Sequence, residues 1–285
     1  MKKVIFTAAI LLVFLVGLSI LLYPYVSSYI NSLRQTRAVA QYYRDVEALN
    51  EEDFTVLFDA ARAYNEELVK NNNRYILSES EMEEYLGLLD PFGNGIMGTL
   101  EISKIGVLLP IYHGTNEGVL RIGAGHLEGT SLPVGGPGTH SVITGHRGLP
   151  SAMLLTELDK IGIGDIFQLH ILNEVLTYKV DQIIVVEPDQ MDELAIAPDK
   201  DYCTLVTCTP YGINSHRMLV RGIRADNQAA AQDGDYQAEP LPIQSDAEAV
   251  DSKLVVGLLL IPPTIIVAIY LAVSIWKLRR KSKLS

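Results

Sequence analysis

Two apolar runs at opposite ends of this 285-residue chain restrict how the rest of it can fold. Residues 4–25 follow Lys2 and Lys3, and residues 254–276 precede a cluster of five basic residues. Each run is long enough to cross a bilayer as a helix. Because basic residues flank both runs on their outer sides, the positive-inside rule places both termini in the cytoplasm. The sequence therefore predicts a two-pass plasma-membrane protein whose middle region folds outside the cell.

Each run has an alternative interpretation. A cleaved signal peptide is the alternative for residues 1–25, but the run is long for such a peptide and no clean small-residue cleavage site precedes Tyr23. An uncleaved anchor is therefore favoured. A buried core helix is the alternative for residues 254–276, but nothing remains after the basic cluster to pack around it. Pro262 and Pro263 would kink this helix, which membrane helices tolerate better than soluble ones.

The charge distribution separates the ends from the middle. The ends hold seven of the 23 Lys and Arg residues and none of the 34 Asp and Glu residues. The middle therefore has 16 basic and 34 acidic residues, a formal charge of −18. A domain this acidic does not attract nucleic acid, which excludes that class of partner. Residues 225–252 hold seven acidic and no basic residues, which predicts a flexible linker.

Helical periodicity marks the first part of the middle region. Asn50 can cap a helix, and residues 34–47 are expected to form a helix that pairs with it. A further short helix is expected at residues 81–88. The predicted apolar positions after the cap are Phe54, Leu57, Ala61, Tyr64 and Leu68.

Short β-rich runs separated by Gly, Pro and Asn occupy residues 98–224. Their regular spacing predicts a closed all-β barrel or a sandwich. The expected strands are residues 100–102, 107–112, 141–145, 166–171, 175–186, 202–208 and 217–222.

The chain contains two cysteines, Cys203 and Cys208. Five positions apart on one extended strand, they point to opposite faces, so a disulfide between them is not expected. Cys203 is interpreted as a small buried residue. Cys208 then remains a free thiol outside the cell, for which catalysis is one reason and a buried core position is the alternative.

The segment TLVTCTPYGINSHRMLVRG, residues 204–222, places a cysteine and an arginine at the ends of two predicted strands. The turn residues between Cys208 and Arg217 predict that the chain folds back and brings the two side by side. A fixed cation beside a thiol favours the thiolate, which is the nucleophilic form. Arg221 has the same strand parity and is the alternative cation, and a surface strand position is the alternative for Arg217.

A histidine that can supply the acid or base lies in a second segment. HSVITGH, residues 140–146, is a β-like run that ends in a Gly-His pair, which puts the His146 imidazole at a strand end with little crowding before it. His140 is the main alternative because it lies in the same segment, whereas His113 and His126 are expected to be structural. Neither a zinc site nor a cofactor is predicted, since no further ligands lie at metal-binding spacing.

Together these motifs resemble the sortases, the cysteine transpeptidases of Gram-positive bacteria. The TLVTC segment, the TGH segment and the downstream Arg217 occur in the order of that family. The longer phrases GAGHLEGTSLPVGGPGTHSVITGHRGLP, residues 123–150, and TCTPYGINSHRMLVRG, residues 207–222, are similar to the pilus-assembling subgroup, class C. The resemblance covers roughly residues 30–225 and continues into the membrane anchors.

The resemblance implies a mainly β fold, the closed sortase β-barrel, with N-terminal helices and two flanking transmembrane helices. It also implies that Cys208 attacks the Thr carbonyl of an LPXTG-like sorting signal and forms a thioacyl-enzyme. Arg217, the first Arg after the turn, would stabilise the oxyanion, and His146 would protonate the leaving Gly amine. In the pilus subgroup a pilin Lys amine accepts the acyl group, so the implied partners are pilins that bear the sorting signal.

A third motif consists of Asp90, Pro91 and Phe92. From the residues alone, Asp-Pro followed closely by two glycines is an ordinary surface turn. The segment also resembles the Asp-Pro-aromatic lid of pilus sortases, which lies in the active-site groove. That resemblance implies that Asp90 pairs with Arg217 and that the Phe92 ring covers the Cys208 sulfur.

Two other functions fit the same residues. A sortase that attaches surface proteins to the cell-wall peptide would use the same chemistry with another amine; the N-terminal helical region, the Asp-Pro-Phe segment and the second apolar run favour the pilus subgroup. A membrane-tethered module that only binds peptides is the second alternative, against which an intact set of Cys208, His146 and Arg217 argues.

These expectations combine into seven consecutive regions. They are a transmembrane anchor (1–25), a helical region (26–70), a lid-containing segment (71–97), the β-barrel catalytic domain (98–224), an acidic linker (225–253), a transmembrane helix (254–276) and a basic cytoplasmic tail (277–285).

Overall fold

The computed structural model describes residues 2–71 and 73–227. Residues 31–227 belong to the larger of two compact units, and residues 2–30 belong to the other. The predicted second transmembrane helix at 254–276, the tail at 277–285 and all but the first three residues of the linker lie outside the described residues.

Helix α1, Lys2–Glu47, joins the predicted anchor and the predicted helix at 34–47 in one continuous element. By length and composition it is the one helix in the described ranges that could cross a membrane. Its last turns belong to the larger unit. There Tyr42 is fully buried, donates its hydroxyl to Met97 O at 3.2 Å and accepts from Leu172 N at 2.7 Å, which fixes the end of α1 to the barrel.

Helix α2, Glu51–Leu68, begins at the predicted cap. The Asn50 side chain accepts from the N–H groups of Glu52 and Asp53, and the Asp53 carboxylate accepts from Asn50 N–H, so both halves of a capping box form. The buried face differs by a small rotation from the predicted one. It consists of Phe54, Phe58, Ala61, Asn65 and Leu68, while Leu57 and Tyr64 are partly buried.

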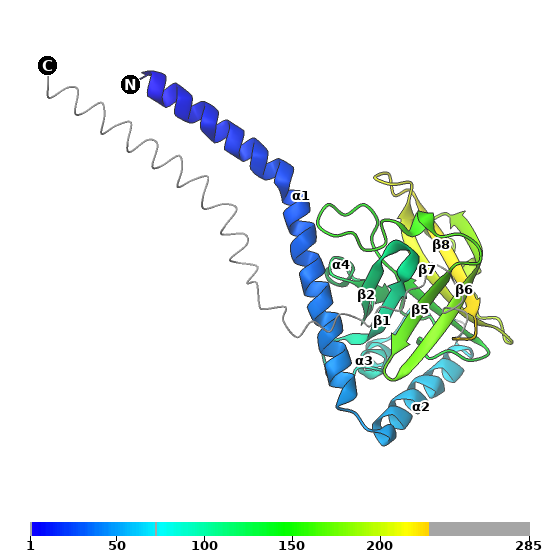
Figure 1. Ribbon diagram of the computed structural model, residues 1–285. Helices are drawn as coiled ribbons and strands as arrows, with labels where there is room; N and C mark the ends of the chain where they lie inside the picture. Colours follow the sequence, from blue (N-terminus) through cyan, green and yellow to red (C-terminus); the bar gives the residue numbers. More distant parts are fainter. Residues whose placement is uncertain (1, 72, 228–285) are drawn as a thin grey trace, which may run out of the picture. The chain divides into compact units, whose positions relative to one another are not determined.

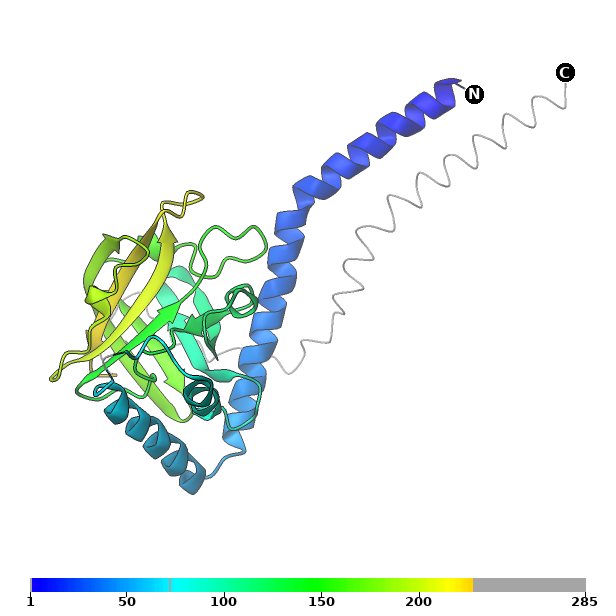
Figure 2. The ribbon, with the colours of Figure 1, turned by 180° about the vertical axis from the view of Figure 1, so that it is seen from behind.

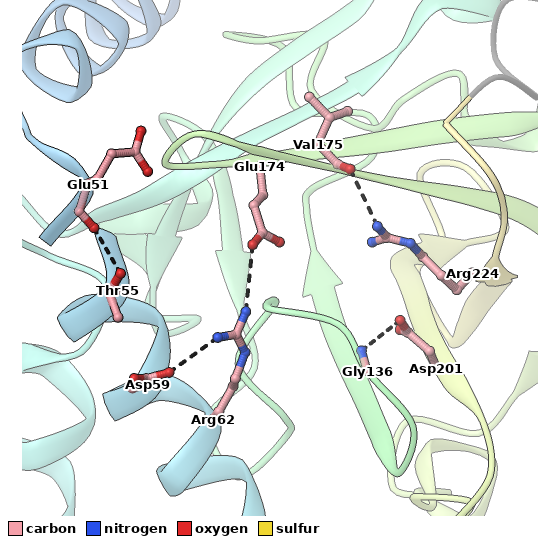
Figure 3. A network of polar contacts seen from close by, with 9 residues as sticks. All are labelled: Glu51, Thr55, Asp59, Arg62, Gly136, Glu174, Val175, Asp201 and Arg224. Carbon is pink, nitrogen blue, oxygen red and sulfur yellow. Dashed lines mark hydrogen bonds and ion pairs between the residues drawn. The ribbon is translucent and has the colours of Figure 1, made fainter. Parts of the chain in front are cut away.

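Asn65 explains the rotation of the buried face of α2. Its amide donates to Leu132 O at 3.0 Å and accepts from Leu132 N at 2.7 Å, so both polar groups of a buried side chain have partners. A pattern of apolar residues could not identify this position. Figure 3 shows a second attachment of α2, in which Arg62 lies 3.6 Å from Glu174 and 3.3 Å from Asp59.

Helix α3, Glu79–Gly87, matches the helix predicted at 81–88, and Ser78 caps it through a second capping box with Glu81. Its Tyr85 is fully buried. The Tyr85 hydroxyl accepts from Gly114 N at 3.0 Å and contacts His126 Nδ1 at 2.9 Å. These bonds fix α3 against one end of the β domain.

Eight strands close into the predicted barrel, in the order β1-β2-β3-β4-β7-β8-β6-β5. Neighbouring strands are antiparallel except for the parallel pairs β2–β3 and β4–β7. The strands are β1 Ile96–Ile102, β2 Val107–His113, β3 Ala124–His126, β4 Thr139–Thr144, β5 Ile166–Ile171, β6 Glu174–Val186, β7 Asp201–Thr209 and β8 His216–Arg224. The short helical turns are α4 Glu117–Leu120, η1 Ser103–Ile105, η2 Leu158–Lys160 and η3 Asp192–Leu194.

Two details of the strand prediction are wrong. Strand β3 was not predicted, because it has three residues and contains Gly125; a Cβ there would lie 2.3 Å from Gly114 O, so the close backbone approach excludes a larger residue. Strand β1 begins at Ile96, four residues before the predicted start of this strand at residue 100.

One residue from each of six strands fills the barrel and is fully buried. The register pairs Leu100 with Leu169 and aligns Leu205 with both Ile143 and Val220, so these side chains form a layer across the interior. Each such burial stabilises the fold by about 1.5–3 kcal/mol. The six residues are Leu100, Ile111, Ile143, Leu169, Leu205 and Val220.

Strand directions define two ends of the barrel. At the first, the β7–β8 end, β1, β4, β6 and β7 finish while β2, β3, β5 and β8 begin. At the second, the α3 end, β1 begins and β2 and β3 finish against Tyr85 of α3. Figures 1 and 2 show α2 and α3 on the same lower side of the barrel.

Candidate active site

The antiparallel pairing of β7 with β8 makes Cys208 the direct partner of Arg217. Directly opposed residues of such a pair have Cβ atoms about 4.5–5.5 Å apart and point to the same face. The predicted turn between them forms: the N–H groups of Ile213 and Asn214 both donate to Pro210 O, at 3.1 and 2.9 Å. The chain therefore folds back and places a cation beside the thiol, as the sequence predicts.

The Arg217 guanidinium is oriented by its own turn, and its Nη1 donates to Asn214 O at 3.2 Å and to His216 O at 3.1 Å. Arg221 is engaged elsewhere. It forms a two-point contact with the Asp181 carboxylate at 3.0 and 2.8 Å, and its guanidinium lies 4.3 Å from the ring centre of Tyr202. Arg217 is therefore the arginine that faces Cys208.

The parallel register of β4 and β7 continues beyond the end of β4. Gly145 N donates to Val206 O at 3.0 Å, and Gly145 O accepts from the Thr207 hydroxyl at 2.8 Å. Extended one residue further along both strands, this register would align His146 with Cys208. Both side chains are half-buried. The β7–β8 end therefore brings together the three residues selected from the sequence.

The sequence analysis and the structure give opposite reasons for the glycine at Gly145. The sequence analysis expected little crowding before His146. The structure instead packs Leu155 against this position, and a Cβ on Gly145 would lie 2.9 Å from the Leu155 side chain. Leu155 N also donates to His146 O at 3.1 Å. Leu155 therefore holds the His146 backbone in place, and only glycine leaves space for it.

Two contacts join the loop after His146 to the end of β7. The Arg147 side chain is 9 % exposed, forms an ion pair with Asp159 and donates through Nη1 to the Thr209 hydroxyl at 3.4 Å. The ring of Tyr211 packs on the backbone of Gly148, where a Cβ would lie 3.0 Å from the ring. These contacts restrict the position of the His146 loop relative to Cys208.

The comparison with known proteins agrees with this arrangement. Residues 100–225 match the sortase domain. The structure is similar to sortase C1 of Streptococcus agalactiae, with 46% identity and a TM-score of 0.65 over 67% of this chain and 99% of that one. The chain belongs to the sortase family. Members of this family are cysteine transpeptidases, and the structure compared above is a sortase of class C.

Two further class C structures are similar. Sortase C of Clostridium perfringens, solved with the C-terminal cell wall sorting motif, is 43% identical with a TM-score of 0.58, over 67% of this chain and 98% of that one. Sortase C of Streptococcus pneumoniae, whose structure was described as giving insights into catalysis and pilin substrate specificity, is 43% identical. The match has a TM-score of 0.60 and covers 67% of this chain and 97% of that one. The chain spans 47% and 63% of the length of two curated sortases that are 30% and 31% identical to it.

Two of the other histidines of this sortase, His126 and His140, are structural. Burial lowers the pKa of His126 and of His140 to about 4, so both rings are neutral at physiological pH. His140 contacts Ala195 O at 3.0 Å and the Thr204 hydroxyl at 2.7 Å. His140 also lies at the start of β4, far from Cys208 along the strand, which excludes it as the alternative to His146.

Both cysteines are free, as the strand parity predicts. Cys203 is fully buried in the main core cluster, and burial raises its pKa well above the ordinary range for a thiol. Cys208 is half-buried at the strand end. Only Cys208 therefore combines access with a neighbouring cation.

The predicted lid contacts are wrong. The Asp90 carboxylate accepts from Asn94 N at 3.0 Å and from Gly95 N at 2.9 Å, so it stabilises its own turn instead of pairing with Arg217. Phe92 packs against the main core cluster. The segment leads into the start of β1, at the α3 end, whereas Arg217 lies at the β7–β8 end. Asp90, Pro91 and Phe92 therefore form the surface turn that their residue types alone predict.

Sequence reasoning missed two residues next to His146. Arg147 is adjacent in sequence, and its burial beside a strand end has no signal in the pattern. Glu117 lies on α4, and its Oε2 is 3.4 Å from His146 Nε2. Because 29 positions separate it from His146, only the folded chain reveals this contact.

Proposed function

We propose that this protein is a membrane-anchored sortase that cleaves an LPXTG-like sorting signal between Thr and Gly. In this proposal it transfers the acyl group to a pilin Lys amine and so polymerises pili. The observation that carries the proposal is the strand register that opposes Arg217 to Cys208 and aligns His146 with Cys208. Membership of the sortase family supports the same chemistry.

In the first half-reaction, the Cys208 thiolate attacks the carbonyl carbon of the Thr residue. The carbonyl oxygen becomes an oxyanion, which the Arg217 guanidinium stabilises; oxyanion donors of this kind contribute about 10²–10³ in rate. As the C–N bond breaks, His146 donates its proton to the Gly nitrogen, which leaves as a neutral amine. The product is a thioester between the acyl group and Cys208.

In the second half-reaction, an amine attacks the thioester carbonyl. The C–S bond breaks, Cys208 leaves as a thiolate, and His146 accepts a proton from the attacking nitrogen. The new bond is an amide, so a Lys side chain as the attacking group gives an isopeptide link between two subunits. This step regenerates Cys208 and protonated His146, which are the starting forms.

The choice of substrates follows from the similar proteins. Sortase C of Clostridium perfringens was solved with a cell wall sorting motif, which supports an LPXTG-like signal as the acyl donor here. The similarity to sortase C of Streptococcus pneumoniae supports a pilin as the partner. The apolar helix α1 supports a membrane anchor, which would hold the enzyme where exported substrates emerge.

A competition experiment tests the acceptor. The full-length protein in detergent micelles is incubated with a pilin that carries the sorting signal, together with equal concentrations of a pilin domain containing the acceptor Lys and of an oligoglycine or stem-peptide amine. The proposal predicts isopeptide-linked pilin oligomers, detected as a ladder by gel electrophoresis and as cross-linked peptides by mass spectrometry. The matched control is the Cys208→Ala protein, which forms neither product.

Two outcomes would contradict parts of this proposal. Exclusive transfer to the wall-type amine would identify a sortase that attaches surface proteins to the cell wall. Binding of the signal peptide without cleavage or a thioester would identify a peptide-binding module and would overturn the catalytic assignment.

A further inference from the structure

The His146 ring has one nitrogen that lacks a hydrogen-bond partner. His146 Nε2 is enclosed by protein and makes no hydrogen bond to any residue in the two described ranges. The nearest acid is Glu117, whose Oε2 lies 3.4 Å away, within ion-pair distance but without hydrogen-bond geometry. A buried N–H without an acceptor is unfavourable, so a small closing movement of this carboxylate would stabilise the site.

Glu117 is held in place from two directions. It is the first residue of α4, whose N-cap is Asn116, and its other oxygen accepts from Arg121 Nε at 2.8 Å. The carbonyl groups at the end of α4 are fixed in turn by α1, because Asn31 donates to Arg121 O at 2.9 Å and Gln35 donates to Ile122 O at 3.0 Å. A surface turn of four residues is therefore anchored on both sides.

We propose that Glu117 is a positioning residue that orients the His146 ring for proton transfer to the leaving amine. This inference rests on the proposed role of His146 as the acid that protonates the leaving amine. A carboxylate next to an imidazole can accept a hydrogen bond from the facing ring nitrogen and so fix the orientation of the ring. With Nε2 directed at Glu117, the other ring nitrogen, Nδ1, is the one that faces the reaction.

The charge state of Glu117 suits this role. The hydrogen bond from Arg121 and the nearby His146 ring lower the pKa of the Glu117 carboxyl, so it is ionised at neutral pH. The other charged groups around His146 already have different partners. Arg147 pairs with Asp159, Arg217 donates to carbonyls of the β7–β8 turn, and Arg121 is neutralised by Glu117 itself.

The chemistry provides a readout that a purely structural role would not change. Cleavage of a peptide requires a proton on the departing amine, whereas cleavage of an ester with an alcohol of low pKa requires none. Loss of the acid function therefore slows amide cleavage while leaving ester cleavage almost unchanged. A variant that merely disturbs the fold or the oxyanion site slows both reactions.

The experiment compares the wild type, Glu117→Gln and His146→Gln as full-length proteins in detergent. Each is given two substrates with the same sorting-signal acyl group, one a peptide and the other an activated ester. Glu157→Gln is the matched control, because it removes one carboxylate from an ion pair with Lys160 in the loop that follows His146. The rates are measured from about pH 5 to pH 9, a range that spans histidine titration.

The inference predicts that Glu117→Gln lowers kcat for the peptide about tenfold, changes KM little and leaves the ester rate within about twofold. Glu157→Gln should behave as the wild type.

An unchanged ratio of peptide to ester rates in Glu117→Gln would overturn the inference, provided that His146→Gln loses peptide cleavage selectively. If His146→Gln also leaves that ratio unchanged, the proposed role of His146 is wrong and the inference fails with it. The two failures are therefore distinguishable by the His146 variant.

Discussion

Each end of the barrel contains a histidine, and the two rings differ in whether their buried nitrogens are hydrogen-bonded. At the α3 end, the fully buried His126 ring contacts the Tyr85 hydroxyl at 2.9 Å and Ser131 O at 2.9 Å, so both ring nitrogens have partners. At the β7–β8 end, the buried nitrogens His146 Nε2 and Arg147 Nε make no hydrogen bond within the described residues. The His126 ring is fully satisfied, and the His146 ring is not.

This difference distinguishes polar groups that stabilise the fold from polar groups that are available for catalysis. Buried polar groups in native proteins are nearly always hydrogen-bonded, so an unsatisfied group that persists is a candidate for a role in binding or catalysis. The α3 end uses its polar groups to connect α3 with β2 and β3. The β7–β8 end keeps a thiol, an imidazole and a guanidinium accessible beside one another. Substitutions at the first end should therefore reduce stability, and those at the second should reduce activity.

The largest expected effect lies at the β7–β8 end. His146→Gln should lower the rate of peptide cleavage by about 10²–10⁴ because it removes the general acid, while the melting temperature stays close to that of the wild type. Steady-state kinetics and circular dichroism measure both. His216→Gln is the control, since this half-exposed ring lies beside Arg217 in sequence but pairs with Glu187. Equal losses in both variants would show that the effect is not specific to His146.

Low pH should destabilise the protein through two buried histidines, His126 and His140. The pKa of His126 and His140 in the fold is about 4, below the ordinary value of 6.5, because burial disfavours the charged rings. The unfolded chain therefore binds more protons between pH 6.5 and 4. Stability is fully present above pH 6.5 and decreases as the pH falls to 4, by about 3 kcal/mol for each ring. A melting temperature that stays constant over this window would contradict the buried neutral state.

Removing one hydroxyl at the α3 end should have a smaller effect. Tyr85→Phe leaves Gly114 N–H without its partner and removes one contact of His126, so the free energy of unfolding should decrease by about 1–3 kcal/mol. Tyr211→Phe is the matched change at the β7–β8 end, where the side chain is exposed, and it should change stability by less than about 0.5 kcal/mol. Thermal unfolding of the two variants compares them directly. A larger loss of stability in Tyr211→Phe than in Tyr85→Phe would contradict the proposed difference between the two ends.

The smallest expected effect concerns the turn at Asp90. Asp90→Ala removes two hydrogen bonds to backbone N–H groups, so it should reduce stability by about 1–2 kcal/mol. The rate at which a small thiol reagent labels Cys208 should not change, because this turn lies at the α3 end. Mass spectrometry of the labelled protein measures that rate. Faster labelling in the variant would show that the segment does cover Cys208 in solution.

Local sequence patterns predicted most of the fold. The turn residues at 209–214 identified the hairpin that pairs Cys208 with Arg217, and Asn50 correctly marked the start of α2. Parity along one strand separated the roles of Cys203 and Cys208. These features depend on neighbours in sequence, which is why a pattern can detect them.

The errors share one cause, which is dependence on distant parts of the chain. Strand β3 forms because it pairs with β2 and β4, and Asn65 is buried because it binds Leu132. The lid prediction failed because a three-residue motif does not determine which end of the barrel it occupies. Glu117 was missed since nothing near it in sequence indicates that α4 lies beside His146.

The central claim is that Cys208 at the β7–β8 end of the barrel is the nucleophile. Its most direct test is mass spectrometry of the full-length protein, quenched in acid soon after mixing with a sorting-signal peptide. The account predicts a thioester on Cys208, present in Cys203→Ala despite a loss of about 1 kcal/mol in stability, and absent from Cys208→Ala. An adduct on Cys203, or peptide cleavage that persists in Cys208→Ala, would contradict it.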